Sequence, residues 1–403
     1  MNVIAPQIVE NLLRTLARAS TENVRVSPRG GNSSEERFLC IPAADLYLDL
    51  RQLKRVVEYE PANLTVCVES GMTLAALQDI LREHGQFLPV DPPQPERATV
   101  GGMIAANAFG PLRLRYGTVR DWLIGVRVAL ANGTLIHGGG KVVKNVAGYD
   151  LPKLFVGSFG TLGVIAEATF KLAPLPAFTR TLRVQFPSHA SALNVMLPIW
   201  RWPVLPNAME LMDPLATQQE SDTFTLLLQL AGSRPVLERQ SREAEALCRQ
   251  HDALQVLRLE GAAEDAHWKR VRDLPATLSE GDITLLEMRV LPSQLVEAIQ
   301  NTHLLSAQAQ LDCTLFVRAL QSIWIALRGE NASVNDLVAK LRAWTLDRKG
   351  HLIVQRAPQS PGARLDAWGA SQADRVLMQR LKAKFDPQHI LNPGVFDGEI
   401  EGA

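Results

Sequence analysis

Three evenly spaced glycines, Gly157, Gly160 and Gly163, stand beside two hydroxyl side chains, Ser158 and Thr161. Glycine costs chain entropy on folding, so several glycines in one apolar segment indicate backbone with positive φ or a close approach by another group. Main-chain N–H groups and hydroxyls on one short path can hold an extended phosphate or the polar edge of a ring. A tight loop before a buried strand is the better explanation for such a loop taken alone.

Two earlier segments have a similar character. A predicted strand at 24–26 leads into a turn at 27–34 that holds an arginine, two glycines, an asparagine and two hydroxyls. This turn suits a pyrophosphate, although a plain hairpin turn is equally compatible with it. Residues 98–110 are almost all small around Gly101 and Gly102, which suits either a helix start pressed against a large flat ligand or tight helix packing.

Two common nucleotide motifs are missing from the sequence. No Gly-x-Gly-x-x-Gly follows a strand and opens a helix, and no Gly-x-x-x-x-Gly-Lys-Ser/Thr loop is present. The glycine triplet that ends before Lys141 lacks both the earlier glycine and the hydroxyl of that loop. Lys141 and Lys144 could neutralise a phosphate or simply be solvated.

Composition limits the classes of partner. The chain has 403 residues, enough for two domains, and its 42 basic and 42 acidic side chains give a formal net charge of zero. A nucleic-acid partner is therefore not expected. The four cysteines are far apart in the sequence and form no Cys-x-x-Cys pair, which indicates thiols in a reducing cytosol. We expect a cytoplasmic protein, without a signal peptide or a membrane span, that meets a membrane only through a partner.

The elements that position the glycine segments form a first predicted domain, residues 1–176. Helical spacing of apolar residues predicts helices at 6–19 and 74–84, and alternating patterns predict strands at 46–50, 56–60, 64–69 and 123–130. Residues 115–121 are predicted to form a polar turn, and the proline-bearing stretch 173–177 a linker.

A second domain is predicted at 177–370, followed by a tail at 371–403. Predicted strands at 182–186, 223–230, 283–290, 315–320 and 323–327 alternate with predicted helices at 189–200, 234–249, 294–302 and 333–344. This order indicates an α+β arrangement, an antiparallel sheet with helices on one face. The tail contains a predicted helix at 373–385 and a rigid turn around Asn392, Pro393 and Gly394.

Taken together, these segments resemble the FAD-linked oxidases of the vanillyl-alcohol oxidase type, which have a PCMH-type FAD-binding domain. The resemblance covers nearly the whole chain, and its most specific part, 141–151 followed by 160–164, looks like the FAD-binding E subunit of bacterial glycolate oxidases. It implies a PCMH-type FAD-binding domain of two α+β subdomains and a C-terminal, ferredoxin-like cap domain with an antiparallel sheet. The motifs are Pro28-Arg29-Gly30-Gly31-Asn32-Ser33, Thr99-Val100-Gly101-Gly102, Tyr116-Gly117-Thr118-Val119-Arg120-Asp121, 156–163 and 386–394.

The resemblance implies FAD as the cofactor and assigns residues to it. The loops at 29–33 and 99–102 would contact the pyrophosphate, 157–165 would line the ribityl and ring portion, and Asn392 would return to the flavin. Asn32 replaces a third glycine of many relatives, and no His or Cys occupies the matching loop positions, so we expect non-covalent FAD. The implied cofactor-binding residues are Arg29, Gly30, Gly31, Asn32, Ser33, Thr99, Gly101, Gly102, Gly117, Asp121, Gly157, Ser158, Gly160, Thr161, Gly163, Ile165 and Asn392.

The implied reaction, oxidation of a small 2-hydroxy acid, needs a base for the hydroxyl proton and a cation for the carboxylate. His351 and Arg356 form the only short segment with both candidates, although a histidine ahead of an aliphatic strand is more often structural. No metal pattern is present. The other candidates in this domain are His251, His267, His303, Arg289, Arg318 and Arg328.

Three functional hypotheses remain open at this point. The first is the FAD subunit of a glycolate oxidase-like complex that converts glycolate to glyoxylate. Its partners would be a second FAD-containing subunit and an iron–sulfur subunit, because this chain has no cysteine pattern for a cluster. The complex could lie peripherally at the inner membrane. The alternatives are a self-sufficient lactate or glycolate oxidase, and a non-catalytic assembly subunit that retains the fold.

Overall fold

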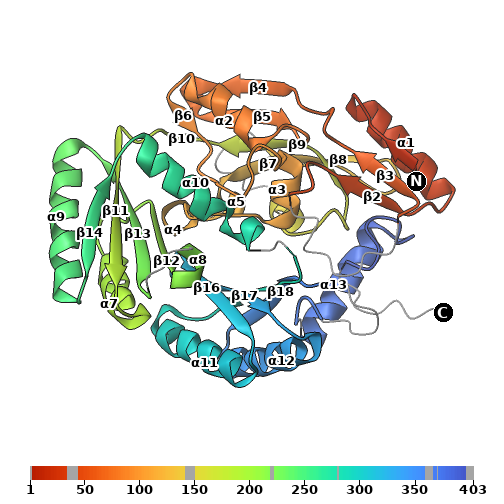
Figure 1. The fold of residues 1–403 in the computed structure, drawn as a ribbon. Helices are drawn as coiled ribbons and strands as arrows, with labels where there is room; N and C mark the ends of the chain where they lie inside the picture. Colours follow the sequence, from red (N-terminus) through yellow and green to blue (C-terminus); the bar gives the residue numbers. More distant parts are fainter. Residues whose placement is uncertain are drawn as a thin grey trace. The chain divides into compact units, whose positions relative to one another are not determined.

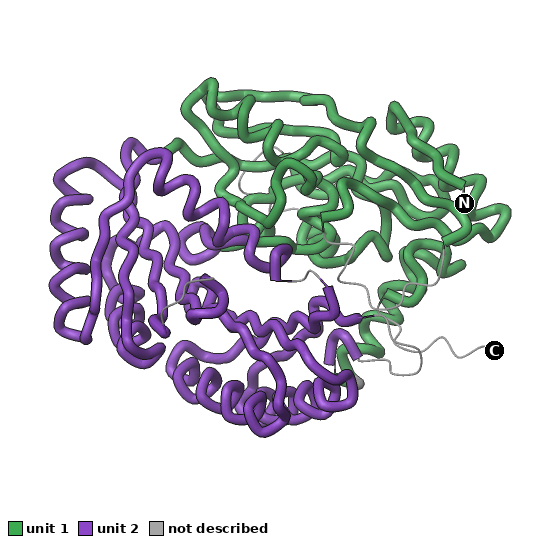
Figure 2. The backbone as a smooth tube through the Cα atoms, in the orientation of Figure 1, with its two compact units in different colours: residues 1–109, 117–175, 370–403 green, residues 110–116, 176–369 purple. Residues whose placement is uncertain are grey.

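The chain folds into two compact units, each built from strands and helices (Figures 1 and 2). The computed structural model describes residues 2–33, 44–140, 150–217, 222–278, 281–358, 366–369 and 371–395. Unit 1 comprises Met1–Phe109, Gly117–Leu175 and Ala370–Ala403, and unit 2 comprises Gly110–Tyr116 and Pro176–Gly369. The α+β class is thus confirmed.

Unit 1 contains a parallel three-stranded sheet, β1-β3-β2, and an antiparallel five-stranded sheet, β4-β5-β9-β7-β8. The strands are β1 Asn2–Ile4, β2 Val26–Arg29, β3 Leu46–Asp49, β4 Val56–Glu60, β5 Thr65–Glu69, β6 Gln86–Phe87, β7 Leu123–Ala129, β8 Leu135–Gly139, β9 Val164–Lys171 and β10 Ala173–Pro174. The helices are α1 Val9–Thr21, α2 Leu74–Arg82, α3 Val100–Ala106, α5 Val119–Trp122, α6 Leu151–Phe155 and α13 Gln372–Phe385.

Two apolar clusters hold unit 1 together. One lies between the five-stranded sheet and helices α2 and α3, where residues such as Leu77, Ile104 and Phe170 are fully buried. The other joins α1 to the three-stranded sheet through residues such as Leu12 and Leu48. The helical spacing of the apolar residues in α1 and α2 explains both, because it puts every third or fourth side chain on the buried face.

Unit 2 is one antiparallel sheet of eight strands in the order β14-β11-β13-β12-β16-β17-β15-β18, as the sequence predicts in outline. Its strands are β11 Phe178–Phe186, β12 Ala208–Met212, β13 Phe224–Gly232, β14 Gln255–Leu259, β15 Thr284–Arg289, β16 Asp312–Arg318, β17 Ser322–Arg328 and β18 His351–Arg356. Its helices are α4 Arg113–Tyr116, α7 His189–Ile199, α8 Pro214–Thr217, α9 Arg234–Gln250, α10 Ala262–Thr277, α11 Leu295–Gln308 and α12 Asn331–Asp347.

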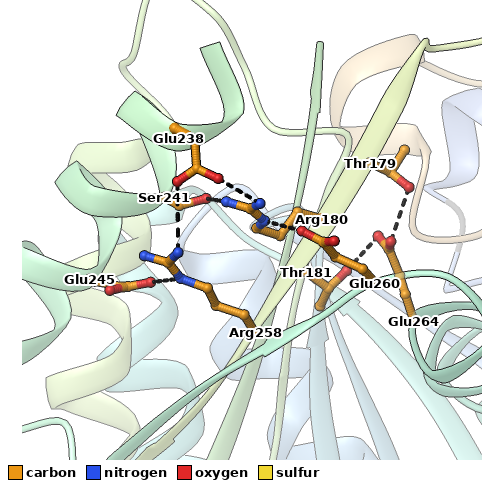
Figure 3. A network of polar contacts seen from close by, with 9 residues as sticks. All are labelled: Thr179, Arg180, Thr181, Glu238, Ser241, Glu245, Arg258, Glu260 and Glu264. Atoms are coloured by element: carbon orange, nitrogen blue, oxygen red, sulfur yellow. Dashed lines mark hydrogen bonds and ion pairs between the residues drawn. The ribbon is translucent and has the colours of Figure 1, made fainter. Parts of the chain in front are cut away.

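Four local expectations are wrong. The predicted turn at 27–34 begins with strand, because β2 runs to Arg29 and pairs with β3. The predicted polar turn at 115–121 holds the end of α4 and most of α5, whose start is capped by Asp121. The predicted linker at 173–177 begins with β10, which pairs with β6. The helices of unit 2 are not confined to one face, because α10 lies on the opposite face from α9 (Figure 3).

Strand β11 connects α9 and α10 through side chains that alternate across the sheet (Figure 3). Arg180 points to the α9 side, where it pairs with Glu238 at 2.7 Å. Thr179 and Thr181 point to the α10 side and donate their hydroxyls to Glu264 at 3.0 and 2.8 Å. Glu264 is buried, so its carboxylate is the acceptor that holds α10 against the sheet.

Replacement of Glu264 by alanine tests this connection. The Glu264→Ala variant leaves the buried hydroxyl of Thr181 and the half-buried donors of Thr179 and Gln229 without their carboxylate acceptor, so we expect the free energy of unfolding to fall by about 2 to 3 kcal/mol. The matched control is Glu260→Ala, which removes a half-exposed partner of Arg180 and should change stability by less than about 1 kcal/mol. Equal losses in denaturant titrations of the two variants would contradict the assignment.

A buried carboxyl group, Asp213, lies between β12 and α8. Its oxygens accept backbone N–H bonds from Ala216 at 2.7 Å and Leu315 at 2.6 Å. Burial raises the pKa of Asp213 to about 6, because the low-dielectric interior disfavours the carboxylate and the backbone donors offset only part of that effect. The folded state therefore binds a proton more tightly than the unfolded chain does.

This raised pKa predicts that stability falls as pH rises from about 4 to about 6 and is then flat, because only in that window does the folded state hold more protons. The contribution of Asp213 to that fall is about 2 to 3 kcal/mol. Denaturant unfolding at pH 4, 5, 6 and 7 measures it, and Asp213→Asn is expected to show a correspondingly smaller fall. The same pH dependence in both proteins would refute the role of Asp213.

Candidate cofactor-binding site

The glycine-rich turn at 157–161 is attached to the C-terminal end of α3. The N–H of Gly157 donates to Ile104 O at 3.0 Å, and the N–H of Phe159 donates to Ala105 O at 2.9 Å. Gly157, Phe159 and Gly160 have φ values of 79°, 50° and 68°, a left-handed conformation that glycine adopts without strain. The small residues of α3 and the glycines of the turn are therefore neighbours in the fold.

Most donors of this turn are used within unit 1, contrary to the expectation that they are free for a ligand. Besides Gly157 and Phe159, the N–H groups of Ser158 and Thr161 donate to Phe155 O and Ser158 O. The hydroxyls donate to the same two carbonyl oxygens, Ser158 to Phe155 O at 2.9 Å and Thr161 to Ser158 O at 2.7 Å. These bonds shape the turn, and a cofactor contact through the remaining lone pairs of either hydroxyl stays a prediction.

The C-terminal tail reaches the same turn. Lys382 of α13 donates its buried ammonium to Thr161 O at 2.8 Å and to Leu391 O at 2.7 Å, and pairs with Asp386 at 2.5 Å. The amide of Asn392 then donates to Phe159 O at 2.8 Å. The tail asparagine thus lies against the glycine turn.

Several predicted glycines are required by the packing of the protein itself. A Cβ at any of them would lie closer than 3.0 Å to another atom of unit 1, so a side chain there would displace the protein before it met a ligand. They are Gly30 against Thr99, Gly31 against Arg97, Gly101 against Ser70, Gly117 against Asp121 and Gly163 against Val128.

Two other predicted glycines have few neighbours. Gly102 lies on the exposed side of α3, and among the described residues a Cβ there would contact only Thr99 Oγ1, at 3.1 Å. A Cβ at Gly157 would contact only Asn107 Cβ, at 3.7 Å, in the same part of the chain. These positions are where a flat molecule can approach the backbone.

Two buried amide oxygens belong to residues beside the glycine-rich turn. Within the described ranges, Asn107 Oδ1 and Asn392 Oδ1 have no hydrogen-bond partner, an uncommon state for buried polar atoms. Asn107 adjoins Gly157, and the amide nitrogen of Asn392 lies 3.2 Å from the place of a Gly160 Cβ. Sequence reasoning missed Asn107, although an asparagine that follows a helix of small residues is a common left-handed cap, the role it has at the end of α3.

The remaining predicted contacts occupy separate places. Arg29 stacks on Tyr47 at 3.8 Å, and Asn32 has a φ of 55°, the left-handed conformation that asparagine tolerates. Asp121 accepts the N–H of Thr118, so its carboxylate caps α5. Ile165 is buried in β9. Ser33 ends the described part of the first loop, and Lys141 and Lys144 lie outside the described residues.

Family models match both units. A model described as an FAD binding domain matches residues 2–139, and one described as the C-terminal domain of FAD linked oxidases matches residues 175–322 and 368–396. The chain belongs to the FAD-linked oxidases. It is a flavoprotein oxidoreductase, and its cofactor is FAD.

Similar proteins cover nearly all of the chain. Glycolate oxidase subunit GlcD of Bacillus subtilis is 29% identical over 97% of this chain and 88% of its own length. D-lactate dehydrogenase of Archaeoglobus fulgidus is 28% identical over 97% and 90%. Glycolate oxidase subunit GlcE of Escherichia coli is 37% identical, but over only 48% of this chain and 54% of its own length.

A solved structure supports the fold. An alkyldihydroxyacetonephosphate synthase matches 97% of this chain and 75% of its own with a TM-score of 0.75 and 18% sequence identity. Among the described residues no helix combines the length and apolarity that crossing a bilayer requires. In the same ranges no three His, Cys, Asp or Glu side chains are grouped to hold a metal ion.

The open positions fit an FAD-linked oxidase. The flavin ring of FAD is large and flat, which suits the glycine backbone at Gly102 and Gly157. The flavin ring edge carries both donors and acceptors, and the unpartnered amide oxygens of Asn107 and Asn392 complement the donors. These four residues of unit 1 would therefore hold the cofactor.

The two predicted catalytic side chains lie in unit 2, at opposite ends of β18. His351 begins the strand and is exposed, and Arg356 ends it and is half-buried. Five residues of strand span about 16 Å, which is longer than one small acid molecule. The structure thus separates His351 from Arg356, and their catalytic role stays a prediction.

The helices α2 and α3 offer a matched pair of variants for the cofactor site. Ala76 and Gly102 are both the third residue of a helix, both exposed, and both donate their N–H to a capping threonine at 3.3 Å. We expect Gly102→Val to weaken FAD binding about tenfold or more, because its methyls fill the open space. Ala76→Val should retain normal binding.

Flavin absorbance after titration of the stripped protein with FAD measures the affinity, and circular dichroism checks that each variant is folded. A folded Gly102→Val protein with wild-type FAD affinity would show that the flavin lies elsewhere.

Proposed function

We propose that this chain is a dehydrogenase of small 2-hydroxy acids that uses non-covalent FAD and works as a subunit of a glycolate oxidase-like complex. The observation that carries the proposal is the similarity to subunit GlcD of B. subtilis over 97% of this chain. The sparsely surrounded backbone at Gly102 and Gly157 in unit 1 supports it. The similarity to subunit GlcE of E. coli supports the same complex.

The reaction divides into tasks for the cofactor and for the protein. Bound FAD would accept the hydride from the substrate carbon, which carries the two electrons of the oxidation. Side chains must then bind the carboxylate, take the hydroxyl proton and exclude water. We propose residues 1–176 and the tail 371–403 as the FAD-binding domain, and residues 177–370 as the cap that provides the substrate-binding or partner-facing side chains.

We further propose that glycolate is oxidised to glyoxylate, and that a second FAD-containing subunit and an iron–sulfur subunit act as partners. Electrons from the reduced flavin must leave the chain, and the cysteines of this chain have no cluster spacing. The complex would be cytoplasmic, or held at the inner membrane by its partners.

Anaerobic reduction of the purified flavoprotein by glycolate tests the proposal. Flavin that bleaches within seconds with glycolate or D-lactate alone supports a self-sufficient enzyme, the alternative that the similarity to D-lactate dehydrogenase of A. fulgidus favours. Flavin that bleaches only after the partner subunits are added supports the proposed complex. Flavin that no 2-hydroxy acid reduces under either condition would overturn the proposed reaction.

Two further measurements test finer points of the proposal. Denaturation followed by filtration should release all yellow colour, because no His or Cys stands at the matching loop positions; colour retained on the chain would contradict non-covalent FAD. His351→Ala should leave FAD content unchanged. If His351 is the base that takes the hydroxyl proton, the variant should also reduce its flavin more slowly and with a changed pH dependence of the rate. An unaltered profile and rate would remove His351 from the reaction.

A further inference from the structure

The tail segment 390–392 pairs with strand β2, which leads into the first glycine-rich loop. Val26 of β2 donates its N–H to Ile390 O at 2.7 Å and accepts the N–H of Asn392 at 2.9 Å. The two apolar residues of the segment are buried in the cluster that also contains residues of α1 and β3. The segment is therefore fixed relative to the start of the loop at 29–33.

The same tail segment contacts the glycine-rich turn at 157–161. Asn392 Nδ2 donates to Phe159 O at 2.8 Å. Pro28 of β2 and Asn392 also meet at Gly160, because a Cβ there would lie 3.6 Å from Pro28 Cγ and 3.2 Å from Asn392 Nδ2. Strand β2, the tail and the turn thus come together at one point of unit 1.

Lys382 supplies the ammonium that joins the turn to the tail. It is 9% exposed, and among the described side chains of α13 it is the only one that is buried. Its Nζ donates to Thr161 O at 2.8 Å and to Leu391 O at 2.7 Å, and it pairs with Asp386 Oδ2 at 2.5 Å. An ammonium has three donors, so these contacts leave none for a ligand. Any effect of Lys382 on a cofactor must therefore act through the residues that it holds.

The remainder of α13 offers little apolar contact to unit 1. Val376 and Leu377 are 38% and 59% exposed. Phe385 is half-buried and packs edge-on against Phe155, with the ring centroids 5.9 Å apart. A segment with few buried apolar contacts opens locally at a low free energy. Docking of the tail therefore depends strongly on the ammonium of Lys382.

We propose that Lys382 is a positioning residue for FAD. It holds the glycine-rich turn, which the family resemblance assigns to the flavin ring, in place beside the loop at 29–33, which the resemblance assigns to the pyrophosphate. A ligand that binds only the assembled arrangement stabilises it, so FAD binding and docking of the tail are coupled. The inference rests on the candidate cofactor site and is independent of the substrate and the partners proposed above.

Two variants remove the ammonium from the full-length protein. Lys382→Met keeps a long side chain but leaves the buried carboxylate of Asp386 without its cation. The double variant Lys382→Met/Asp386→Asn removes both charges, and its amide oxygen still accepts one of the two backbone N–H bonds that Asp386 accepts. The double variant thus separates loss of the bond to Thr161 O from the cost of an unpaired buried charge. The matched control is Lys384→Met, which changes an exposed lysine of the same helix.

FAD and ADP serve as probes of the stripped proteins, because ADP contains the pyrophosphate but lacks the flavin. We expect both Lys382 variants to raise the FAD Kd about tenfold or more and the ADP Kd less than about threefold, since Lys382 holds the turn rather than the first loop. The control should bind both probes as the wild type does. Calorimetry measures each Kd.

General loosening of unit 1 would weaken FAD and ADP equally, and that result, or an unchanged FAD Kd, would overturn the role of Lys382. Circular dichroism checks that each variant is folded. If Lys382→Met does not fold, the double variant decides.

Limited digestion of the wild-type protein with trypsin measures the coupling. Arg380 and Lys384 are exposed on α13, and cleavage after either residue separates the tail segment from the domain. A protease cuts a helix where it opens, so the rate of cleavage follows local opening. We expect mass spectrometry to show cleavage in α13 about tenfold slower with saturating FAD than without it. Equal rates in the two states would overturn the coupling.

Failure of the candidate cofactor site has a different result. Wild-type FAD affinity in Gly102→Val and in both Lys382 variants would place the flavin elsewhere and reject the site together with the positioning role. Weakened binding in Gly102→Val alone would retain the site and reject the role of Lys382. Neither readout requires oxidation of a 2-hydroxy acid, so both are independent of the proposed reaction.

Discussion

The buried ammonium of Lys382 is the interaction on which the FAD-binding unit depends. A buried charge is stable only with close acceptors, and Lys382 has two backbone carbonyls and the carboxylate of Asp386. Asp386 in turn accepts the N–H groups of Ile390 and Leu391, which forms the turn before Asn392. The hydrogen bond from Lys382 to Thr161 O thus joins the last helix to the glycine-rich turn, and the ion pair with Asp386 holds the turn that precedes Asn392.

Packing around that turn divides the glycines into two groups with different physical roles. Those in the first loop and at the start of β9 exist because another part of unit 1 approaches within contact distance. Gly102 and Gly157 face space that the described residues do not fill. A glycine-rich segment can therefore serve both protein packing and ligand access, and only the positions of the second kind report on a cofactor directly.

In the sheet of unit 2, the alternation of side chains along each strand places many polar side chains on one face. Because successive side chains point to opposite faces, the face beneath four helices is apolar apart from the Arg180 network, and the other face collects buried charges and hydroxyls. Arg318 and Glu210 are a fully buried pair, and such pairs often contribute little net stability once desolvation is counted.

The sequence by itself determined the local elements and the family. Apolar periodicity placed α1, α2, α7, α9 and most strands within a few residues, because those signals depend on neighbours along the chain. It missed α10, whose apolar stripe is weak and which contains Pro275. The family resemblance that the glycine motifs carry implied FAD, but the motifs did not separate packing glycines from open ones.

Only the tertiary structure decided which residues meet. Glu210 and Arg318 are 108 residues apart and become partners because β12 and β16 are adjacent in the sheet. Asn392 and Phe159 are 233 residues apart and become hydrogen-bond partners because Lys382 binds both the glycine-rich turn and the end of the tail. Such pairings depend on strand order and on the docking of the tail, which no short pattern encodes, so the site follows from the fold while its elements follow from the sequence.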